Sequence, residues 1–194
     1  MKYLNVKNIK NENNKNAGSS LIEIIVVVLI IAIAAGAAVM SLSAALRANT
    51  TRAATELAGI MSEARRESMT RPADSVELRV YRSDSDGKYY ADIVMTENGS
   101  GAAASAAEKL IESKAIASGA VSLTASASGE SAGASASITG ENSGFAVIRF
   151  DKRSGKLSSF KVNGTENGYT SIVISGAKTS TVRISQHTGR SYVE

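Results

Sequence analysis

A long apolar run follows a polar, lysine-bearing start and is the strongest hydrophobic feature of this chain. The run covers 21–39, contains no proline and carries one charge, Glu23. Its 19 residues, at about 1.5 Å each in a helix, match the roughly 30 Å of a hydrocarbon layer. A secretory signal peptide is the alternative, but its apolar core of about 7–15 residues is shorter. The pattern predicts one membrane-spanning helix with the lysine-rich N-terminal side in the cytoplasm.

The helical pattern continues past the apolar run and becomes amphipathic. From 41 to 70 there is no proline, and only Gly59 interrupts strong helix formers. Pro72 ends the pattern, because the residue before a proline is pushed out of the α region. We expect one helix of about 50 residues, roughly 75 Å long. Its second half has an apolar face formed by Leu46, Ala53, Leu57, Ile60 and Ala64.

After Pro72 the hydrophobic period changes to two, which is typical of strands. "SVELRVY" and "YYADIVM" flank the turn residues "DSDGK" and predict a hairpin. The Ala/Ser/Gly-rich segment that follows, about 96–144, has little to bury. We expect it to be mostly long loop, weak strands or disorder, with a short helix at "AAEKLIESKAI" and a strand at "AVSLTAS". Further strands are predicted at "FAVIRF", "LSSFKVN", "TSIVIS" and "TVRISQ", with a last edge strand in "HTGRSYVE".

A long helix followed by mainly antiparallel strands predicts an α+β fold. The sheet is expected to cover the amphipathic half of the helix, because that apolar stripe needs a partner outside lipid.

Charge and composition narrow the possible functions. The 194 residues carry a net charge of +4, but residues 1–18 alone hold four lysines against one glutamate. The rest of the chain is almost neutral, although 149–194 is locally basic with eight cations and three anions. There is no cysteine, which excludes disulfides and thiolate metal sites.

Enzymatic chemistry finds little support in the sequence. The only histidine is His187, and no nucleophile-elbow, zinc-protease or phosphate-loop pattern occurs. We interpret His187 as a surface turn residue. Asp84, Asp86 and Gly87 resemble the start of a calcium loop, but Met95 stands where the loop needs its glutamate. We therefore expect no catalytic residues, no metal and no cofactor.

The start of the apolar run carries a recognisable motif. Gly18 is followed by "SSLIEI" and then by the apolar helix, and this pattern resembles the prepilin signature of type IV pilins and type II secretion pseudopilins. The resemblance implies cleavage between Gly18 and Ser19 by a prepilin peptidase on the cytoplasmic face, then methylation of the new Ser19 amine. It also implies a pilin-like fold: one long N-terminal helix on a β-rich head.

The resemblance further implies what the protein works with. The expected partners are other pilin or pseudopilin subunits, the prepilin peptidase/methyltransferase, an assembly platform protein and membrane lipid. The protein would reside in the inner or plasma membrane as a single-pass protein and then move into an extracytoplasmic filament. Its function would be that of a structural subunit of a type IV pilus or a type II secretion-like filament.

Ser19 stands where the family prefers phenylalanine or methionine, a departure that bears on methylation more than on cleavage. Two features favour a minor subunit. Met40 stands where a proline is commonest in major pilins. The ending with Thr188, Gly189 and Arg190 resembles the closing strands of H-type, FimT-like pseudopilins.

The expected organisation has four parts. These are a leader at 1–18, a transmembrane and assembly helix at 19–40, its amphipathic continuation at 41–71 and an exported head at 72–194.

Glu23 is the candidate assembly residue. An unpaired charge in lipid costs roughly 2.5–3.5 kcal/mol at the bilayer centre and less near a helix end. In a filament, a neighbour's Ser19 amine would neutralise Glu23, so we expect the glutamate to recruit the subunit and set its register. A plain anchored surface protein, with a tolerated interfacial glutamate and an uncleaved leader, is the simpler alternative.

A DNA-binding minor pilin of an uptake filament is the other alternative. Clustered cations would contact phosphates and bind in a salt-dependent way. Solvation, or pairing with the acidic 74–141 segment, explains the same residues without nucleic acid. The candidates are Arg149, Lys152, Arg153, Lys156, Arg183 and Arg190.

Overall fold

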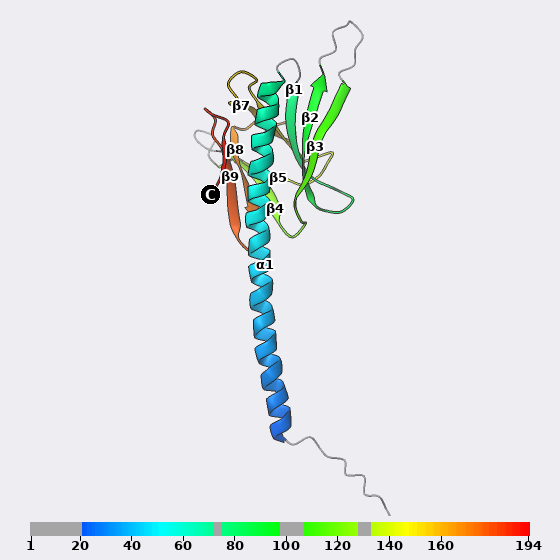
Figure 1. The fold of residues 1–194 in the computed structure, drawn as a ribbon, viewed down its shortest axis with the longest axis vertical. Helices are drawn as coiled ribbons and strands as arrows, with labels where there is room; N and C mark the ends of the chain where they lie inside the picture. The colour runs from blue at the N-terminus through cyan, green and yellow to red at the C-terminus, as the bar shows by residue number, and fades with distance from the viewer. Residues whose placement is uncertain (1–20, 72–74, 98–106, 128–132) are drawn as a thin grey trace, which may run out of the picture. The chain divides into compact units, whose positions relative to one another are not determined.

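The computed structural model describes residues 21–71, 75–97, 107–127 and 133–194 (Figure 1). The chain divides into two units, Met1–Ser41 and Leu42–Glu194, which are considered separately below. Cleavage residues Gly18 and Ser19, and parts of the Ala/Ser/Gly-rich segment, lie outside the described residues.

One continuous helix, α1 (Leu21–Thr70), begins at the apolar run and passes from the first unit into the second. The prediction of a single helix of about 50 residues is confirmed. It ends just before Pro72, as expected from the restriction that a proline places on its predecessor. Among the described residues, no helix meets the length and hydropathy required to cross a membrane.

The second unit contains two five-stranded sheets whose neighbouring strands are all antiparallel. The first sheet has the order β3-β2-β1-β6-β7, with strands Ser75–Arg82 (β1), Tyr89–Glu97 (β2), Ala107–Ala117 (β3), Ala146–Phe150 (β6) and Leu157–Val162 (β7). The second has the order β10-β9-β8-β4-β5, with strands Ser122–Ala127 (β4), Ser135–Ile138 (β5), Tyr169–Ser175 (β8), Thr179–Ile184 (β9) and Ser191–Val193 (β10). The α+β class is confirmed.

All the strands predicted from the sequence are present, but the one short helix predicted among them is wrong. The hairpin β1–β2, strand β4, the four strands near the end and the edge strand β10 all form. The short helix predicted at "AAEKLIESKAI" is instead β3, an 11-residue strand paired with β2. Helix propensity is a weak prior, and pairing with an otherwise open strand overrides it. The pairing of β3 with β2 has two register shifts, between Tyr89 and Tyr90 and between Ile93 and Val94.

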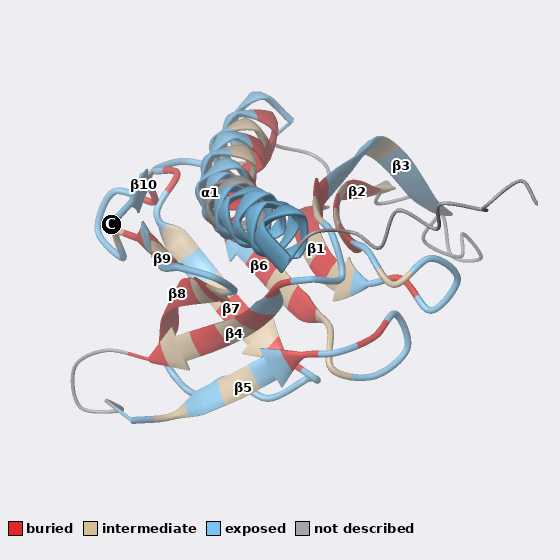
Figure 2. Ribbon diagram, turned by 90° about the horizontal axis from the view of Figure 1, so that it is seen from below, coloured by how far each residue is buried: buried red, intermediate tan, exposed pale blue. Residues whose placement is uncertain are grey.

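The core lies between the helix and the two sheets. Buried residues recur along the helix every three or four positions, namely Thr50, Ala53, Ala54, Leu57, Ile60, Met61, Ala64, Glu67 and Ser68. Four of the five residues predicted for this face are therefore buried, while the side chain of Leu46 is outside the described set. Figure 2 shows buried residues, in red, on the strands of both sheets and on α1.

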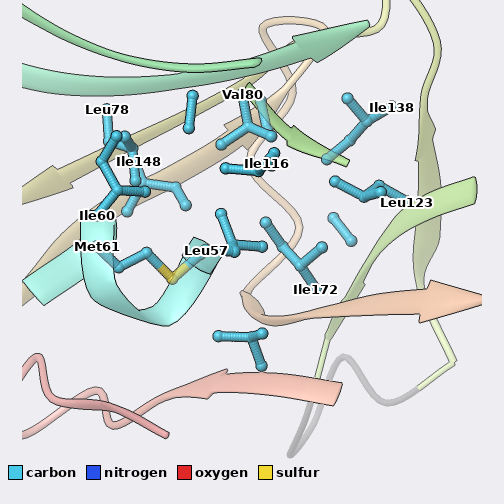
Figure 3. Close-up of a cluster of buried hydrophobic side chains, with 14 of the residues drawn as sticks. Leu57, Ile60, Met61, Leu78, Val80, Ile116, Leu123, Ile138, Ile148 and Ile172 are labelled. Carbon is cyan, nitrogen blue, oxygen red and sulfur yellow. The ribbon is translucent and has the colours of Figure 1, made fainter. Parts of the chain in front are cut away.

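Both sheets contribute to the same cluster. In Figure 3, Leu57 of the helix lies beside Ile172 of the second sheet, and Ile60 lies beside Ile148 of the first. At the border between the sheets the rings of Phe160 (β7) and Tyr169 (β8) pack 5.6 Å apart at a tilt. The helix and both sheets therefore share one hydrophobic core.

We expect substitutions on the two faces of the helix to act in opposite directions. Leu57 is fully buried, so Leu57→Ala should lower the free energy of unfolding by about 2–5 kcal/mol. Gly59 is exposed, and a Cβ there would meet nothing within 4 Å. Gly59→Ala should raise stability by about 0.5–1 kcal/mol, because glycine costs more backbone entropy in a helix. Urea unfolding of the full chain in detergent, followed by circular dichroism, measures both. Equal effects of the two variants would contradict this packing.

Candidate functional site

The described residues of the first unit present an exposed apolar helix surface. Eleven large hydrophobic side chains between Leu21 and Ile33 are each 47–75% exposed. All the described residues of 21–37 are exposed, on every side of the helix. A helix that is apolar all round is stable only when it is surrounded by lipid or by other apolar helices. This segment, 21–37, is called the assembly segment below.

Glu23 is the one charged residue of the assembly segment and lies in the first turn of α1. Its side chain is exposed. A carboxylate in the first turn interacts favourably with the helix dipole. When the surrounding apolar surface is covered, however, the same carboxylate loses water and needs a cationic partner.

The second unit contains a turn geometry that recurs three times. The turns Ser83–Lys88, Asp151–Lys156 and Ser185–Arg190 each have a hydrogen bond from the first residue's N–H to the sixth residue's carbonyl, 2.8–2.9 Å long. In each, the fifth residue is a glycine with φ between 65° and 67°, whose N–H donates to the first residue's carbonyl. The last three residues read Asp-Gly-Lys, Ser-Gly-Lys and Thr-Gly-Arg. The turns predicted at "DSDGK" and around His187 are confirmed.

Arg65 of α1 joins two of these turns. Its Nε–H is shared between the carbonyl oxygen of Gly155, at 2.9 Å, and that of Thr188, at 3.0 Å. The turns approach so closely that a Cβ on Gly189 would lie 1.8 Å from the Gly155 carbonyl oxygen. The two turns therefore form one surface, here called the double turn (151–156 and 185–190).

The double turn gathers four of the six cations proposed for DNA binding: Lys152, Arg153, Lys156 and Arg190. Arg153, Lys156 and Arg190 are exposed, and Lys152 is half-buried. Within these two turns Asp151 is the only acidic residue.

The other two candidate cations are engaged elsewhere. The Nε of Arg149 lies 3.1 Å from Oε1 of Glu77, so Arg149 pairs with the acidic segment as the simpler interpretation expected. The Nε of Arg183 lies 2.8 Å from Oε2 of Glu194. Neither belongs to the double turn.

Asp151 stabilises its own turn. The hydrogen bond from the Ser154 hydroxyl, 2.5 Å long, lowers the pKa of Asp151 most, and the backbone N–H of Ser154 at 2.7 Å adds to this. Because the folded-state pKa is depressed, the stabilisation is present above the ordinary aspartate pKa. It is lost as the pH falls through the lower folded-state value.

His187 and Asp86, the other residues considered as candidates from the sequence, both lie in turns. His187 is exposed in the double turn. Asp86 accepts hydrogen bonds from the Lys88 N–H at 3.0 Å and the Tyr90 hydroxyl at 2.9 Å, so it belongs to the hairpin turn. Among the described residues no cluster of three or more metal-binding side chains occurs.

Sequence reasoning did not identify Arg65 as part of this site. The repeated Ser/Thr-Gly-Lys/Arg ending marks the two turns, but nothing in the linear pattern shows that they meet. Arg65 lies 90 residues from Gly155 and 123 from Thr188.

A matched pair of glycine substitutions tests the double turn. Gly189→Ala should destabilise the protein by several kcal/mol, because the new Cβ meets both a positive φ and the Gly155 carbonyl. Gly164→Ala has a similar φ of +76° but open space, so it should cost only about 1 kcal/mol. The difference in unfolding free energy, from urea titration, measures the close approach. Equal costs would show that the turns do not touch.

Comparison with known proteins gives one match. A family model described as the prokaryotic N-terminal methylation motif matches residues 13–39. No curated protein and no solved structure matches the chain. The matched range contains Gly18, Ser19 and Glu23 and the whole assembly segment, and it supports a pilin or pseudopilin type of subunit processed by prepilin peptidase.

Proposed function

We propose that this protein is a structural subunit, a minor pilin or pseudopilin, of a type IV pilus or type II secretion-like filament. The observation that carries the proposal is the methylation motif at 13–39, which coincides with an unpartnered apolar helix segment. In this proposal, prepilin peptidase cuts after Gly18, and the new Ser19 amine is methylated. The subunit is held at the membrane until it enters the filament.

Assembly follows from the chemistry of the assembly segment. Side chains such as Leu21 and Ile33, 75% and 66% exposed, would pack against the same segments of neighbouring subunits. Burying each large apolar side chain stabilises by about 1.5–3 kcal/mol before the costs of association. This gain is non-directional, so a polar contact is needed to set the register.

Glu23 would supply that contact through the Ser19 amine of a neighbour. In apolar surroundings an unpaired carboxylate is strongly unfavourable, whereas a paired one is tolerated. A subunit that enters one turn out of register leaves both groups unpaired. The pair therefore selects one position in the filament more than it adds net stability.

The second unit would be the exported head, and its ending supports the H-type assignment. Thr188, Gly189 and Arg190 close a hairpin turn, and β10 follows as the edge strand of the second sheet. We assign the head a place on the filament and no catalytic reaction.

Removing the Glu23 carboxylate tests the assembly role. Glu23→Ala should lower incorporation into filaments at least tenfold, equivalent to about 1.4 kcal/mol, while the leader is still removed. Glu63→Ala is the control, because Glu63 lies on the same helix and pairs locally with Arg66. Sheared filament fractions from cells that carry each variant give the incorporation.

The intact mass and N-terminal peptide of the membrane-extracted protein complete this experiment. A chain that begins at Ser19, with or without one methyl group, supports the proposal. A chain that retains the leader would show a plain anchored surface protein instead. Normal incorporation of correctly processed Glu23→Ala would refute the role of the glutamate alone.

DNA binding is a second candidate function, favoured by one observation. The double turn brings Lys152, Arg153, Lys156 and Arg190 together on one surface. Cations that neutralise phosphates release counterions. The logarithm of the binding constant therefore falls linearly with the logarithm of the salt concentration, with a slope of about −0.9 per phosphate. Four contacts predict a slope of roughly −3 to −4.

Charge reversal in the double turn tests this candidate. Arg153→Glu with Arg190→Glu should abolish retardation of duplex DNA by the full chain in detergent at low salt. Arg183→Glu is the control, because Arg183 is occupied by Glu194 outside the double turn. Titration of salt gives the slope. Failure of the unmodified chain to retard DNA at low salt would eliminate this function and leave the filament role untouched.

A further inference from the structure

The face of the first sheet that points away from the core carries an unusual set of side chains. Four of the eight aromatic residues in the described part of the chain are buried in the core, namely Tyr89, Phe150, Phe160 and Tyr169. Three of the others, Tyr81, Tyr90 and Phe145, lie half-buried on this outer face. In a chain that is only 5% aromatic, this is a large share for a solvent-facing surface.

The aromatic residues lie side by side across adjacent strands. Tyr81 of β1 pairs directly with Tyr90 of β2, and their rings are 6.0 Å apart and nearly parallel, at 21°. Phe145 precedes β6, on the other side of β1, and lines the same hollow as Tyr81. The three rings form an apolar strip that runs across the strands.

Two adjoining hollows accompany this strip. One, of about 190 Å³, is lined by Tyr81, Asp92 and Glu141 among others. The second, of about 400 Å³, is lined by Glu77, Val147 and Lys161 among others. Both share Arg79 and Phe145. Together they form one groove, here called the outer groove, of a size typical of small-molecule sites, about 300–1,000 Å³.

Polar side chains in the outer groove are held in fixed positions by one another. Asp92 accepts hydrogen bonds from the Tyr81 hydroxyl at 2.9 Å and the Ser113 hydroxyl at 2.6 Å. Arg79 forms a two-pronged pair with Glu108, at 2.9 and 2.6 Å. Such groups present donors and acceptors to a ligand without losing much side-chain entropy.

The charges in the outer groove nearly cancel. Its lining contains three cations, Arg79, Arg149 and Lys161, and four anions, Glu77, Asp92, Glu108 and Glu141. Glu77 is 7% exposed and is held between Arg79 and Arg149. A polyanion such as DNA gains nothing from this balance, because it needs a net positive surface. A neutral ligand that both donates and accepts hydrogen bonds fits it.

We propose that the outer groove binds a neutral glycan. A sugar ring has an apolar C–H face, which packs on an aromatic ring, and a rim of hydroxyls, which bond to carboxylate and guanidinium groups. Tyr81 and Phe145, with Tyr90 stacked beside Tyr81, supply the first surface, and Arg79 and Asp92 supply the second. This inference goes beyond the filament role and does not depend on it, because the groove lies wholly within the second unit.

A glycan array of defined neutral and acidic oligosaccharides tests the proposal. The probe is the full chain in lauryl dimethylamine oxide, since detergents with sugar head groups would compete for the groove. We expect binding to a class of neutral oligosaccharides. For a saccharide that binds, Phe145→Ala and Tyr81→Ala should each weaken affinity at least tenfold, as measured by titration calorimetry. Phe145→Tyr should retain binding, because it keeps the ring.

Tyr192→Ala serves as the matched control, since Tyr192 is an exposed aromatic on β10 of the other sheet. It should leave binding unchanged, and circular dichroism should show the same fold in every variant. Three outcomes would overturn the proposal: no neutral saccharide bound, binding of acidic saccharides only, or binding unaffected by both Phe145→Ala and Tyr81→Ala. Self-association that Phe145→Ala abolishes would instead assign the groove to a second copy of this chain.

Discussion

The burial of one face of α1 against both sheets is the constraint on which the rest of the structure depends. Alanines 53, 54 and 64 let the strands approach the helix closely. Hydrogen bonds then fix the position: the Ser68 hydroxyl donates to the Phe150 carbonyl, and the Ser191 hydroxyl donates to the Ala58 carbonyl, both at 2.9 Å. The inner faces of both sheets pack against α1, so the outer faces and the turns remain available for other roles.

Much of the fold could be predicted from the sequence because its signals are local. The helix ends where Pro72 forbids it, and the hairpin β1–β2 follows from alternation around a glycine turn. Strand β3 was missed because its Ala, Glu, Lys and Leu residues favour a helix. Only the open edge of β2, which is a tertiary partner, turns this segment into a strand. The division into two sheets likewise depends on pairings between strands distant in sequence, such as β4 with β8.

The candidate sites differ in the same way: one depends on residues adjacent in the sequence, and the other depends on residues that only the fold brings together. The motif around Glu23 is contiguous, so sequence alone located it and the family match agrees. The basic final segment was visible as composition, but its six proposed DNA contacts are separated in space. Arg149 and Arg183 are ion-paired outside the double turn, and the other four lie on two turns that the side chain of Arg65 joins. Composition counts charges, whereas only the fold decides which of them share a surface.

The two units differ in how much of their surface and how many of their polar groups have partners within the chain. This difference indicates where the protein has apolar surface left to bury. In the described part of the chain, no buried side-chain nitrogen or oxygen lacks a hydrogen-bond partner. The assembly segment, in contrast, exposes eleven large apolar side chains. At about 1.5–3 kcal/mol each, their burial would contribute roughly 16–33 kcal/mol before the costs of association are subtracted. This gross gain is the driving force for covering the segment. Because Glu23 is the one charge within it, we propose that Glu23 restricts which partners can cover it.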